Sequence, residues 1–337
     1  GVPMSIASDE FGGFPPPERS RKTAASEKSY GVGDRIFKGL TGAMAALVLI
    51  VLGGAAVAML WGGLLAFKTF GPRFLWSSEW DAVGHRFGAF VPIYGTLVTS
   101  AIAIVLAVPV SFGIAIFLTE LAPKWLRGPV GTAIELLAAV PSIIYGMWGL
   151  FVFVPFVATY LEPWMNDHVG TLPIIGPLFS GPPIGIGMLT AGTILAIMIL
   201  PFITAVMRDV FGAVPAELKE SAVALGSTTW EVISHVSLPY TRSAVVGAIF
   251  LGLGRALGET MAVTFVLGNA HEFSLSLFMP GNSIAAAIAN EFTEADSPLY
   301  VSSLIALGFL LFVVTFIVLA LAKLMLLRLG RMEGAKS

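Results

Sequence analysis

Two ionisable side chains, Arg255 and Glu259, lie in an apolar stretch, residues 244–269, that is long enough to cross a membrane. Arg255 is the only one of the 19 lysines and arginines inside such a stretch. Each charge costs about 2.5–3.5 kcal/mol at the centre of a bilayer, so both must face protein or water. Arginine can donate two parallel hydrogen bonds to a tetrahedral oxyanion, and a carboxylate can accept one from a protonated oxygen. We therefore predict an oxyanion site at Arg255 and Glu259.

The spacing of these two residues also favours a common helical face. If residues 244–269 form one helix, side chains four positions apart lie on the same side, and Arg255 lies about 17 Å along the span, near its middle. A structural ion pair between helices is the alternative, although arginine before glutamate is the weaker order for a pair within one helix. A proton relay in a secondary transporter or channel is a further alternative.

Six segments have the length and composition of membrane spans. A helix needs about 20 apolar residues to cross a hydrocarbon core of about 30 Å. The segments that qualify are residues 39–67, 91–118, 130–161, 186–207, 244–269 and 299–322. Hydrophobic residues make up 56% of the chain and charged residues 12%, which is too few to cover the surface of a soluble protein of this size. We predict an all-α integral membrane protein with six transmembrane helices.

The remaining composition excludes several kinds of site. The net charge of −2 argues against a nucleic-acid partner, because proteins that bind phosphate backbones are basic. The chain has no cysteine, which excludes disulfides, thiol nucleophiles and thiolate metal ligands. Its four histidines are scattered without the spacing of metal ligands. We therefore expect no metal site and no catalytic residues.

Lysine and arginine placement predicts the orientation of the chain. Basic residues are dense before the first span, after the second, fourth and sixth spans, and absent from the loops after the third and fifth. Such residues collect on the cytoplasmic side, so we expect both termini to be cytoplasmic. The predicted organisation is a disordered cytoplasmic tail at 1–36, a first transmembrane helix with an external loop at 37–90, a transmembrane core at 91–322 with a cytoplasmic loop at 209–242, and a cytoplasmic C-terminal tail at 323–337.

Glu135 is a second carboxylate within a predicted span. It lies one to two turns inside the cytoplasmic end of the third span and near Arg127 in the sequence. A carboxylate at this position can stabilise the start of a helix or reach toward the interface. A gating role is the alternative, and the sequence favours neither.

The loop at 209–242 contains its own helical pattern. Pro215 suits the first turn of a short helix, and Gly226 suits its end. Leu218, Ala222 and Leu225 share one face of this helix, as expected for a helix that docks on another surface. A second helical stretch is predicted at 228–236, ending at Leu238-Pro239.

The spacing within this loop resembles the cytoplasmic EAA loop of bacterial ABC-importer permeases. The matching positions are Glu220, Ser221, Ala222, Gly226, Leu238 and Pro239, with Ser221 in place of the usual first alanine. In that family the loop forms a coupling helix seated in a cleft of the ATPase subunit. Residues 135–150, 187–192, 207–211 and 254–264 are similar to the permeases of bacterial ATP-driven phosphate importers.

This resemblance implies the type I ABC importer permease fold in the bacterial plasma (inner) membrane, with Arg255 and Glu259 at the positions implicated in phosphate passage. It also implies a complex of two different permease subunits, two ATPase subunits and an external phosphate-binding protein. The chain lacks the glycine-rich loop that cradles ATP, so ATP and Mg would be used by the partner ATPase, with no cofactor bound by this chain. A permease for sulfate, molybdate or phosphonate is the alternative within the class.

Overall fold

A computed structural model describes residues 21–334, with the side chains of residues 33–324, and shows no β-strand within that part of the chain. The chain divides into two units, residues 1–55 and residues 56–337. The first unit contributes the N-terminal part of helix α1 (Arg21–Gly62), where every described side chain from residue 33 to residue 54 is exposed. An apolar helix with no buried face suits contact with lipid.

The prediction of six membrane-spanning helices is confirmed. The spans are Gly33–Gly62, Phe90–Leu121, Ser142–His168, Met188–Gly212, Thr229–Leu257 and Pro298–Leu324. Residues 1–20 of the predicted tail lie outside the described residues, whereas residues 21–36 belong to α1. At the other end, α15 (Pro298–Gly334) continues through most of the predicted C-terminal tail.

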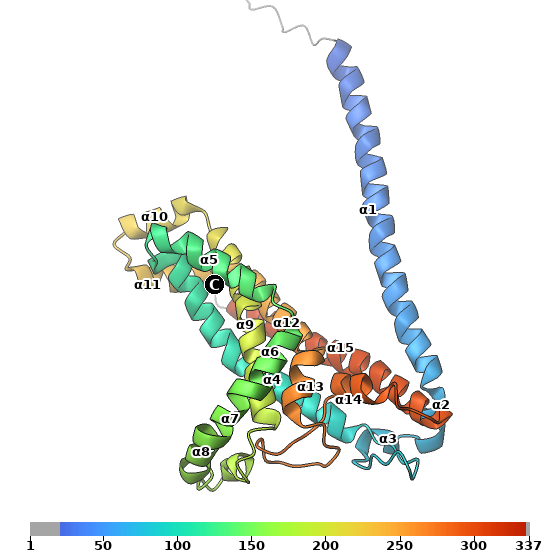
Figure 1. The fold of residues 1–337 in the computed structure, drawn as a ribbon. Coiled ribbons are helices and arrows are strands. Elements are labelled where there is room, and N and C mark those ends of the chain that lie inside the picture. Colours follow the sequence, from blue (N-terminus) through green and yellow to red (C-terminus); the bar gives the residue numbers. More distant parts are fainter. Residues whose placement is uncertain (1–20, 335–337) are drawn as a thin grey trace, which may run out of the picture. The chain divides into compact units, whose positions relative to one another are not determined.

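Helices α4 (Phe90–Ile116) and α9 (Met188–Gly212) form the centre of the second unit (Figure 1). They can approach closely because Gly192 has no side chain: a Cβ at this position would lie only 2.7 Å from the side chain of Ile102. Each helix contains a proline, and the Ser111 hydroxyl of α4 donates a 3.0 Å hydrogen bond to the Leu200 carbonyl of α9. Small residues and hydroxyl groups are the usual means of packing helices in a membrane.

The third span differs from the prediction. Helix α5 (Lys124–Ala138) ends before Pro141, and a separate series follows: α6 (Ser142–Trp148), α7 (Val154–Phe156) and α8 (Glu162–His168), joined by π-helical turns at Gly149–Phe153 and Val157–Leu161. A proline has no backbone N–H and disfavours helical dihedrals in the preceding residue, so the chain breaks there. The span therefore begins at Ser142, and α5, with Glu135, lies outside it.

The fifth span also has different limits. Its start is earlier, because α11 (Thr229–Val232) continues through a π-helical turn at Ile233–Ser237 into α12 (Leu238–Leu257). Pro239 lies in the first turn of α12, directly after the π-helical turn, and the helical chain continues through it, so the predicted helix end at Leu238-Pro239 is wrong. The span ends at Leu257, and α13 (Met261–Leu267) follows after a break.

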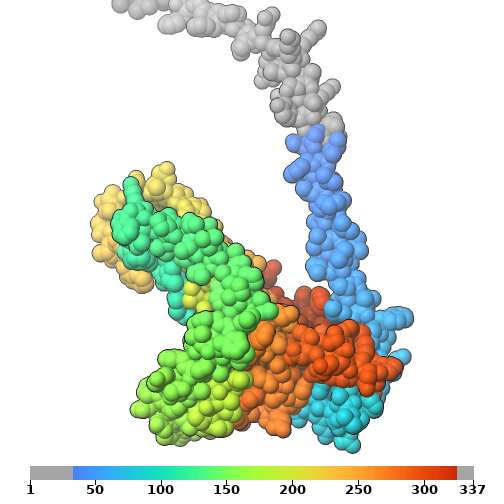
Figure 2. Space-filling view, in the orientation of Figure 1, coloured from blue at the N-terminus to red at the C-terminus, as the bar shows by residue number. Residues whose placement is uncertain are grey.

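The second unit presents different features at its two ends (Figure 1). Helices α10 (Ala216–Ala224) and α11 project at one end, and α8 lies at the other. The space-filling view shows α10 and α11, in yellow to light orange, at the tip of this end of the unit, partly behind the teal-green residues that end α4 and begin α5 (Figure 2).

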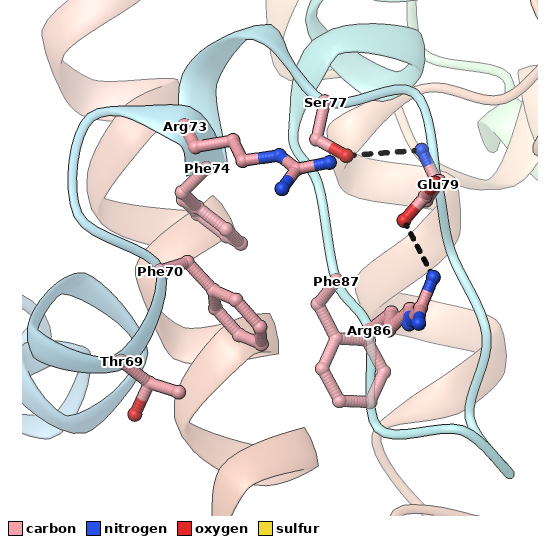
Figure 3. A pocket seen from close by; sticks show the side chains of 8 residues that line it. All are labelled: Thr69, Phe70, Arg73, Phe74, Ser77, Glu79, Arg86 and Phe87. Carbon is pink, nitrogen blue, oxygen red and sulfur yellow. Dashed lines mark hydrogen bonds and ion pairs between the residues drawn. The ribbon is translucent and has the colours of Figure 1, made fainter.

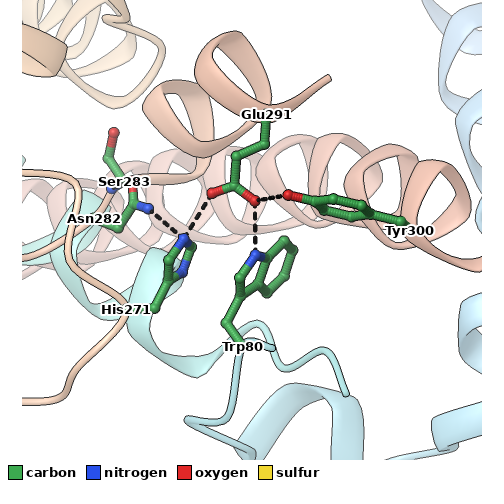
Figure 4. Close-up of polar contacts among 6 residues, drawn as sticks. All are labelled: Trp80, His271, Asn282, Ser283, Glu291 and Tyr300. Carbon is green, nitrogen blue, oxygen red and sulfur yellow. Dashed lines mark hydrogen bonds and ion pairs between the residues drawn. The ribbon is translucent and has the colours of Figure 1, made fainter. Parts of the chain in front are cut away.

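A hydrogen-bonded cluster around Glu291 ties together four segments at the end away from α10 (Figure 4). Glu291 ends helix α14 (Ile284–Glu291) and accepts hydrogen bonds from Trp80 Nε1 at 2.7 Å and the Tyr300 hydroxyl at 2.6 Å. Its other oxygen lies 2.6 Å from Nε2 of His271, whose ring stacks on Trp80. The cluster thus fastens residues 77–90 and the loop before α14 to α15.

A small pocket lies near this cluster, between α2 (Leu64–Phe70), α3 (Arg73–Trp76) and the segment that follows (Figure 3). Its volume is about 320 Å³. The residues that line it are Thr69, Phe70, Arg73, Phe74, Ser77, Glu79, Arg86 and Phe87. None of these is a predicted site residue, and Arg86 is paired with Glu79 at 3.6 Å.

We expect the variant Glu291→Gln to lower the free energy of unfolding in detergent by about 1–3 kcal/mol, because one amide oxygen cannot replace a carboxylate that serves three donors. Burial raises the pKa of Glu291, but hydrogen bonds from His271, Tyr300 and Trp80 outweigh it and hold that pKa below its ordinary value of 4.5. The stabilisation is therefore complete above about pH 4.5 and is lost as the pH falls through the lower, folded-state pKa.

Urea unfolding of the wild type and the variant between pH 3 and pH 7 measures this difference. The exposed Glu294, replaced by Gln, is the matched control and should unfold like the wild type. The difference in free energy of unfolding between the wild type and Glu291→Gln should become smaller as the pH falls. A difference that stays the same would contradict the assignment.

Candidate functional site

Arg255 lies in the last turn of α12 rather than in the middle of a span. Its side chain is exposed, and its guanidinium carbon lies 5.8 Å from the centroid of the Phe202 ring on α9. A guanidinium over an aromatic face gains a modest cation–π attraction and keeps its hydrogen-bond donors available. Within the described residues no carboxylate lies within 4.0 Å of Arg255, so none of them neutralises its charge.

Glu259 lies in the break between α12 and α13, which corrects the prediction of one continuous helix. Gly258 ends α12, and the low helix propensity of glycine suits this position. Glu259 Oε1 accepts a 3.3 Å hydrogen bond from the backbone N–H of Ala262 and so satisfies a free donor at the start of α13. The expected helical face shared by Arg255 and Glu259 therefore does not exist, and the two side chains form no ion pair.

The broken helix nevertheless leaves the cation of Arg255 at the end of α12 and the carboxylate of Glu259 within the three-residue gap that follows. Non-helical backbone at membrane depth is tolerated where it is buried in protein or lines a water-filled cavity. Glu259 is half-buried and has one oxygen beyond the one that caps α13. The arrangement suits an anion that approaches Arg255 from the open side of this chain.

Sequence reasoning missed two aromatic residues near Arg255. Phe202 lies under the guanidinium, and Tyr145 of α6 lies near the same charge. The Tyr145 hydroxyl donates a 2.9 Å hydrogen bond to the carbonyl of Leu137, just before the break at Pro141. No sequence signal separates these aromatic residues from the others that face lipid.

Glu135 pairs with a residue other than the one the sequence suggested. Arg208 Nη2 lies 2.6 Å from Glu135 Oε1 and 2.9 Å from Asp209 Oδ1, so the pair joins α5 to the end of α9. Arg127 instead donates from Nε to the Ala122 carbonyl at 2.8 Å. Arg208 directly follows the predicted span 186–207, and only the packing of α5 against α9 brings it to Glu135.

These ionic groups line a cavity of about 820 Å³ between α5, α9, α10 and the π-helical turn Phe117–Leu121 that follows α4. Its lining carries three basic and two acidic side chains, together with Thr119 and Thr132. The charged residues are Arg127, Arg208, Lys219, Glu135 and Asp209. Because the charges nearly balance, the cavity has no strong preference for an anion.

The loop helix forms as predicted. Helix α10 begins directly after Pro215, and Gly226 follows its end with a φ of 93°, a conformation that glycine adopts without strain. Thr228 and Glu231 form a capping box that starts α11. Leu238 and Pro239 begin α12, and Leu238 packs against the core of the second unit.

The predicted motif residues on α10 lie on an open surface. Helix α10 has no buried residue, and Glu220 and Ser221 are exposed. On the expected docking face, Ala222 is half-buried while Leu218 and Leu225 are 44% and 89% exposed. Exposed leucines together with Trp230, which is 67% exposed, form the kind of apolar patch that marks a protein-protein contact.

The described part of the chain contains no group of three or more histidine, aspartate or glutamate side chains placed to hold a metal ion. The buried Glu162 is the other acidic group of note within a span. Its Oε2 accepts a 2.8 Å hydrogen bond from the Gly185 N–H, which fastens the loop before α9 to α8.

Comparison with known proteins assigns the family. Residues 108–331 match the binding-protein-dependent transport system inner membrane component. The phosphate transport system permease protein PstC of Xylella fastidiosa (strain 9a5c) is 63% identical, covering 89% of this chain and 93% of that protein. The PstC of Pasteurella multocida (strain Pm70) is 56% identical, covering 94% of this chain and 99% of that protein.

A solved structure shares the fold. A chain of a bacterial alginate ABC transporter, in complex with its alginate pentasaccharide-bound periplasmic protein, superposes with a TM-score of 0.57 at 16% identity, covering 90% of this chain and 97% of that chain. The ABC importer permease fold is thereby confirmed. With six spans and these relatives, the protein is a multi-pass inner membrane protein and a transport component rather than an enzyme. The chain belongs to the family of inner membrane components of binding-protein-dependent transport systems.

Proposed function

We propose that this chain is the permease subunit of an ATP-driven phosphate importer and forms half of the translocation pathway. The observation that carries the proposal is Arg255, an arginine in a membrane-spanning helix whose charge no carboxylate of the described chain neutralises. A passing oxyanion supplies the missing negative charge. The identity of 63% to a phosphate transport permease supports phosphate as that anion.

The complex proposed around this chain has a second, different permease subunit, two ATPase subunits and an external phosphate-binding protein. The exposed Leu218 of α10 and the exposed Leu225 directly after it support docking of the ATPase there. In this proposal α10 and α11 lie on the cytoplasmic side, and the distribution of lysine and arginine supports cytoplasmic termini. ATP and Mg belong to the ATPase, and this chain binds no cofactor.

Transport proceeds by alternating access. ATP binding closes the ATPase dimer and displaces α10, and the spans then open toward the external side to receive phosphate from the binding protein. Hydrolysis restores the inward-facing state. Arg255 holds the phosphate oxygens, and the free oxygen of Glu259 accepts a hydrogen bond from a protonated phosphate oxygen, which fully ionised sulfate lacks.

Glu135 has a gating role in this scheme. The ion pair with Arg208 joins α5 to the end of α9, directly before the loop that leads to α10. A movement of α10 changes the position of Arg208, and α5 follows while the pair is intact. This role is an alternative to a purely structural contact, which the partial exposure of Glu135 also suits.

We expect Arg255→Ala to lower phosphate uptake by the assembled complex at least about tenfold, because a charge-assisted hydrogen bond to a bound anion is worth about 1.5–3 kcal/mol. Radiolabelled phosphate uptake into proteoliposomes measures the effect, with unlabelled sulfate as competitor. Arg255→Lys should retain part of the activity, because it keeps the charge and loses the two-point geometry.

Arg73→Ala removes an exposed arginine from α3 and should leave uptake unchanged. Normal uptake by an assembled Arg255→Ala complex would refute the site. Strong competition by sulfate would favour a permease for another oxyanion, and uptake without the ATPase would favour a secondary transporter.

A second expectation concerns the docking surface. Leu225→Asp should weaken retention of the ATPase by the purified permease about tenfold or more, because apolar side chains at the centre of an interface dominate its affinity. Co-purification at increasing salt and ATP-driven uptake measure the loss. Val83→Asp alters a residue that is 92% exposed and lies outside α10 and α11, and should have no effect. Unchanged ATPase binding in Leu225→Asp would argue against α10 as the docking element.

A further inference from the structure

Helix α10 is held to the membrane-spanning part by a single short ion pair between described residues. Lys219 Nζ lies 2.6 Å from Oε1 of Glu120, which belongs to the π-helical turn Phe117–Leu121 at the end of α4. The two side chains are only 21% and 13% exposed, whereas those of the pair Arg86–Glu79 are 70% and 52% exposed. Ion pairs that are partly withdrawn from water interact more strongly than pairs on the surface.

Apolar packing contributes little to the attachment of α10. No side chain of α10 is buried, and the cavity of about 820 Å³ separates its start from α5 and the end of α9. Lys219 lies at the wall of this cavity. Packed side chains of α10 therefore oppose its movement only weakly. When α10 moves, the Lys219–Glu120 pair either pulls the end of α4 with it or breaks.

The other end of this contact is connected to the core. The π-helical turn that carries Glu120 continues α4 without interruption, and Leu118 in that turn is buried. Helix α4 packs along α9 in the centre of the unit, with the Ser111 hydroxyl bonded to Leu200. A displacement of Glu120 is thus transferred to the helix pair at the centre. Wide turns of this type frequently occur at functional positions in helices.

We propose that the ion pair Lys219–Glu120 transmits the movement of the coupling helix α10 to α4, so that both are positioning residues for transport. The proposal rests on the proposed function, because it needs an ATPase docked on α10. It adds a route of coupling distinct from the motif residues Glu220, Ser221, Ala222 and Gly226, which form no ion pair with α4 or the turn that follows it. A purely structural contact would affect assembly instead.

The test is a charge-exchange cycle in the complete complex, reconstituted in proteoliposomes. Phosphate uptake and ATP hydrolysis are measured in the same vesicles for Lys219→Ala, Glu120→Gln and the exchanged pair Lys219→Glu with Glu120→Lys. We expect uptake per ATP hydrolysed to fall about fivefold in each single variant and to return to within about twofold of the wild type in the exchanged pair. Lys124→Ala, at an exposed lysine of α5, is the matched control and should keep the wild-type ratio.

Each result bears on the proposal. Single variants that assemble and keep the wild-type ratio overturn it, and so does an exchanged pair that assembles without recovery. If the single variants fail to assemble, Lys219→Arg and the exchanged pair are compared with the wild type instead. Either complex, if it assembles but shows a low phosphate uptake per ATP hydrolysed, overturns the transmission role. The proposed function fails separately, if the wild-type complex takes up no phosphate.

If the wild-type complex takes up no phosphate, the role of the ion pair can still be tested by measuring ATP hydrolysis. Stimulation of ATP hydrolysis by a substrate-loaded binding protein depends on transmission between the membrane part and the ATPase. Loss of this stimulation in Lys219→Ala, with recovery in the exchanged pair, supports transmission whatever the substrate is. Stimulation that is unaffected in Lys219→Ala overturns it.

Discussion

Hydrocarbon cannot hydrogen-bond to the backbone or solvate a charge, and this constraint governs how the chain is built. The spans are helices because a helix satisfies its own N–H and carbonyl groups. The breaks at residues 139–141 and 258–260 are therefore informative, since each leaves backbone groups that need other partners. Glu259 supplies one of them by accepting a hydrogen bond from Ala262. The same constraint makes the uncompensated charge of Arg255 a property that needs a functional explanation.

The two ends of the larger unit are held together by different interactions. At the end with Glu291, a carboxylate serving donors from three other segments fastens loops to α14 and α15. At the end with α10, ionic contacts replace apolar packing around a cavity, and leucines remain exposed. An end fastened by hydrogen bonds and an end with little apolar packing suit the alternating access proposed for this chain, in which one part moves against another.

Charged groups at the α10 end are coupled by geometry rather than by sequence distance. Lys219 and Glu120 are far apart in the chain, as are Arg208 and Glu135, yet both pairs approach to 2.6 Å. The Lys219–Glu120 pair is largely withdrawn from water and joins α10 to the turn that ends α4, whereas Glu135 in the other pair is 56% exposed and joins α5 to the end of α9. Separating the first pair therefore costs more than separating a pair on the surface.

Composition and periodicity determined the number of spans, the helix in the coupling loop and the family resemblance, because long apolar runs and the signals around Pro215 and Gly226 act locally. Tertiary structure decided where α5 and α12 end, that Glu259 caps α13 instead of sharing a face with Arg255, and that Glu135 pairs with Arg208. The physical reason is that hydropathy is nearly uniform across a membrane segment. It cannot show where a glycine or proline interrupts a helix, nor which distant charge a packed neighbour brings within reach.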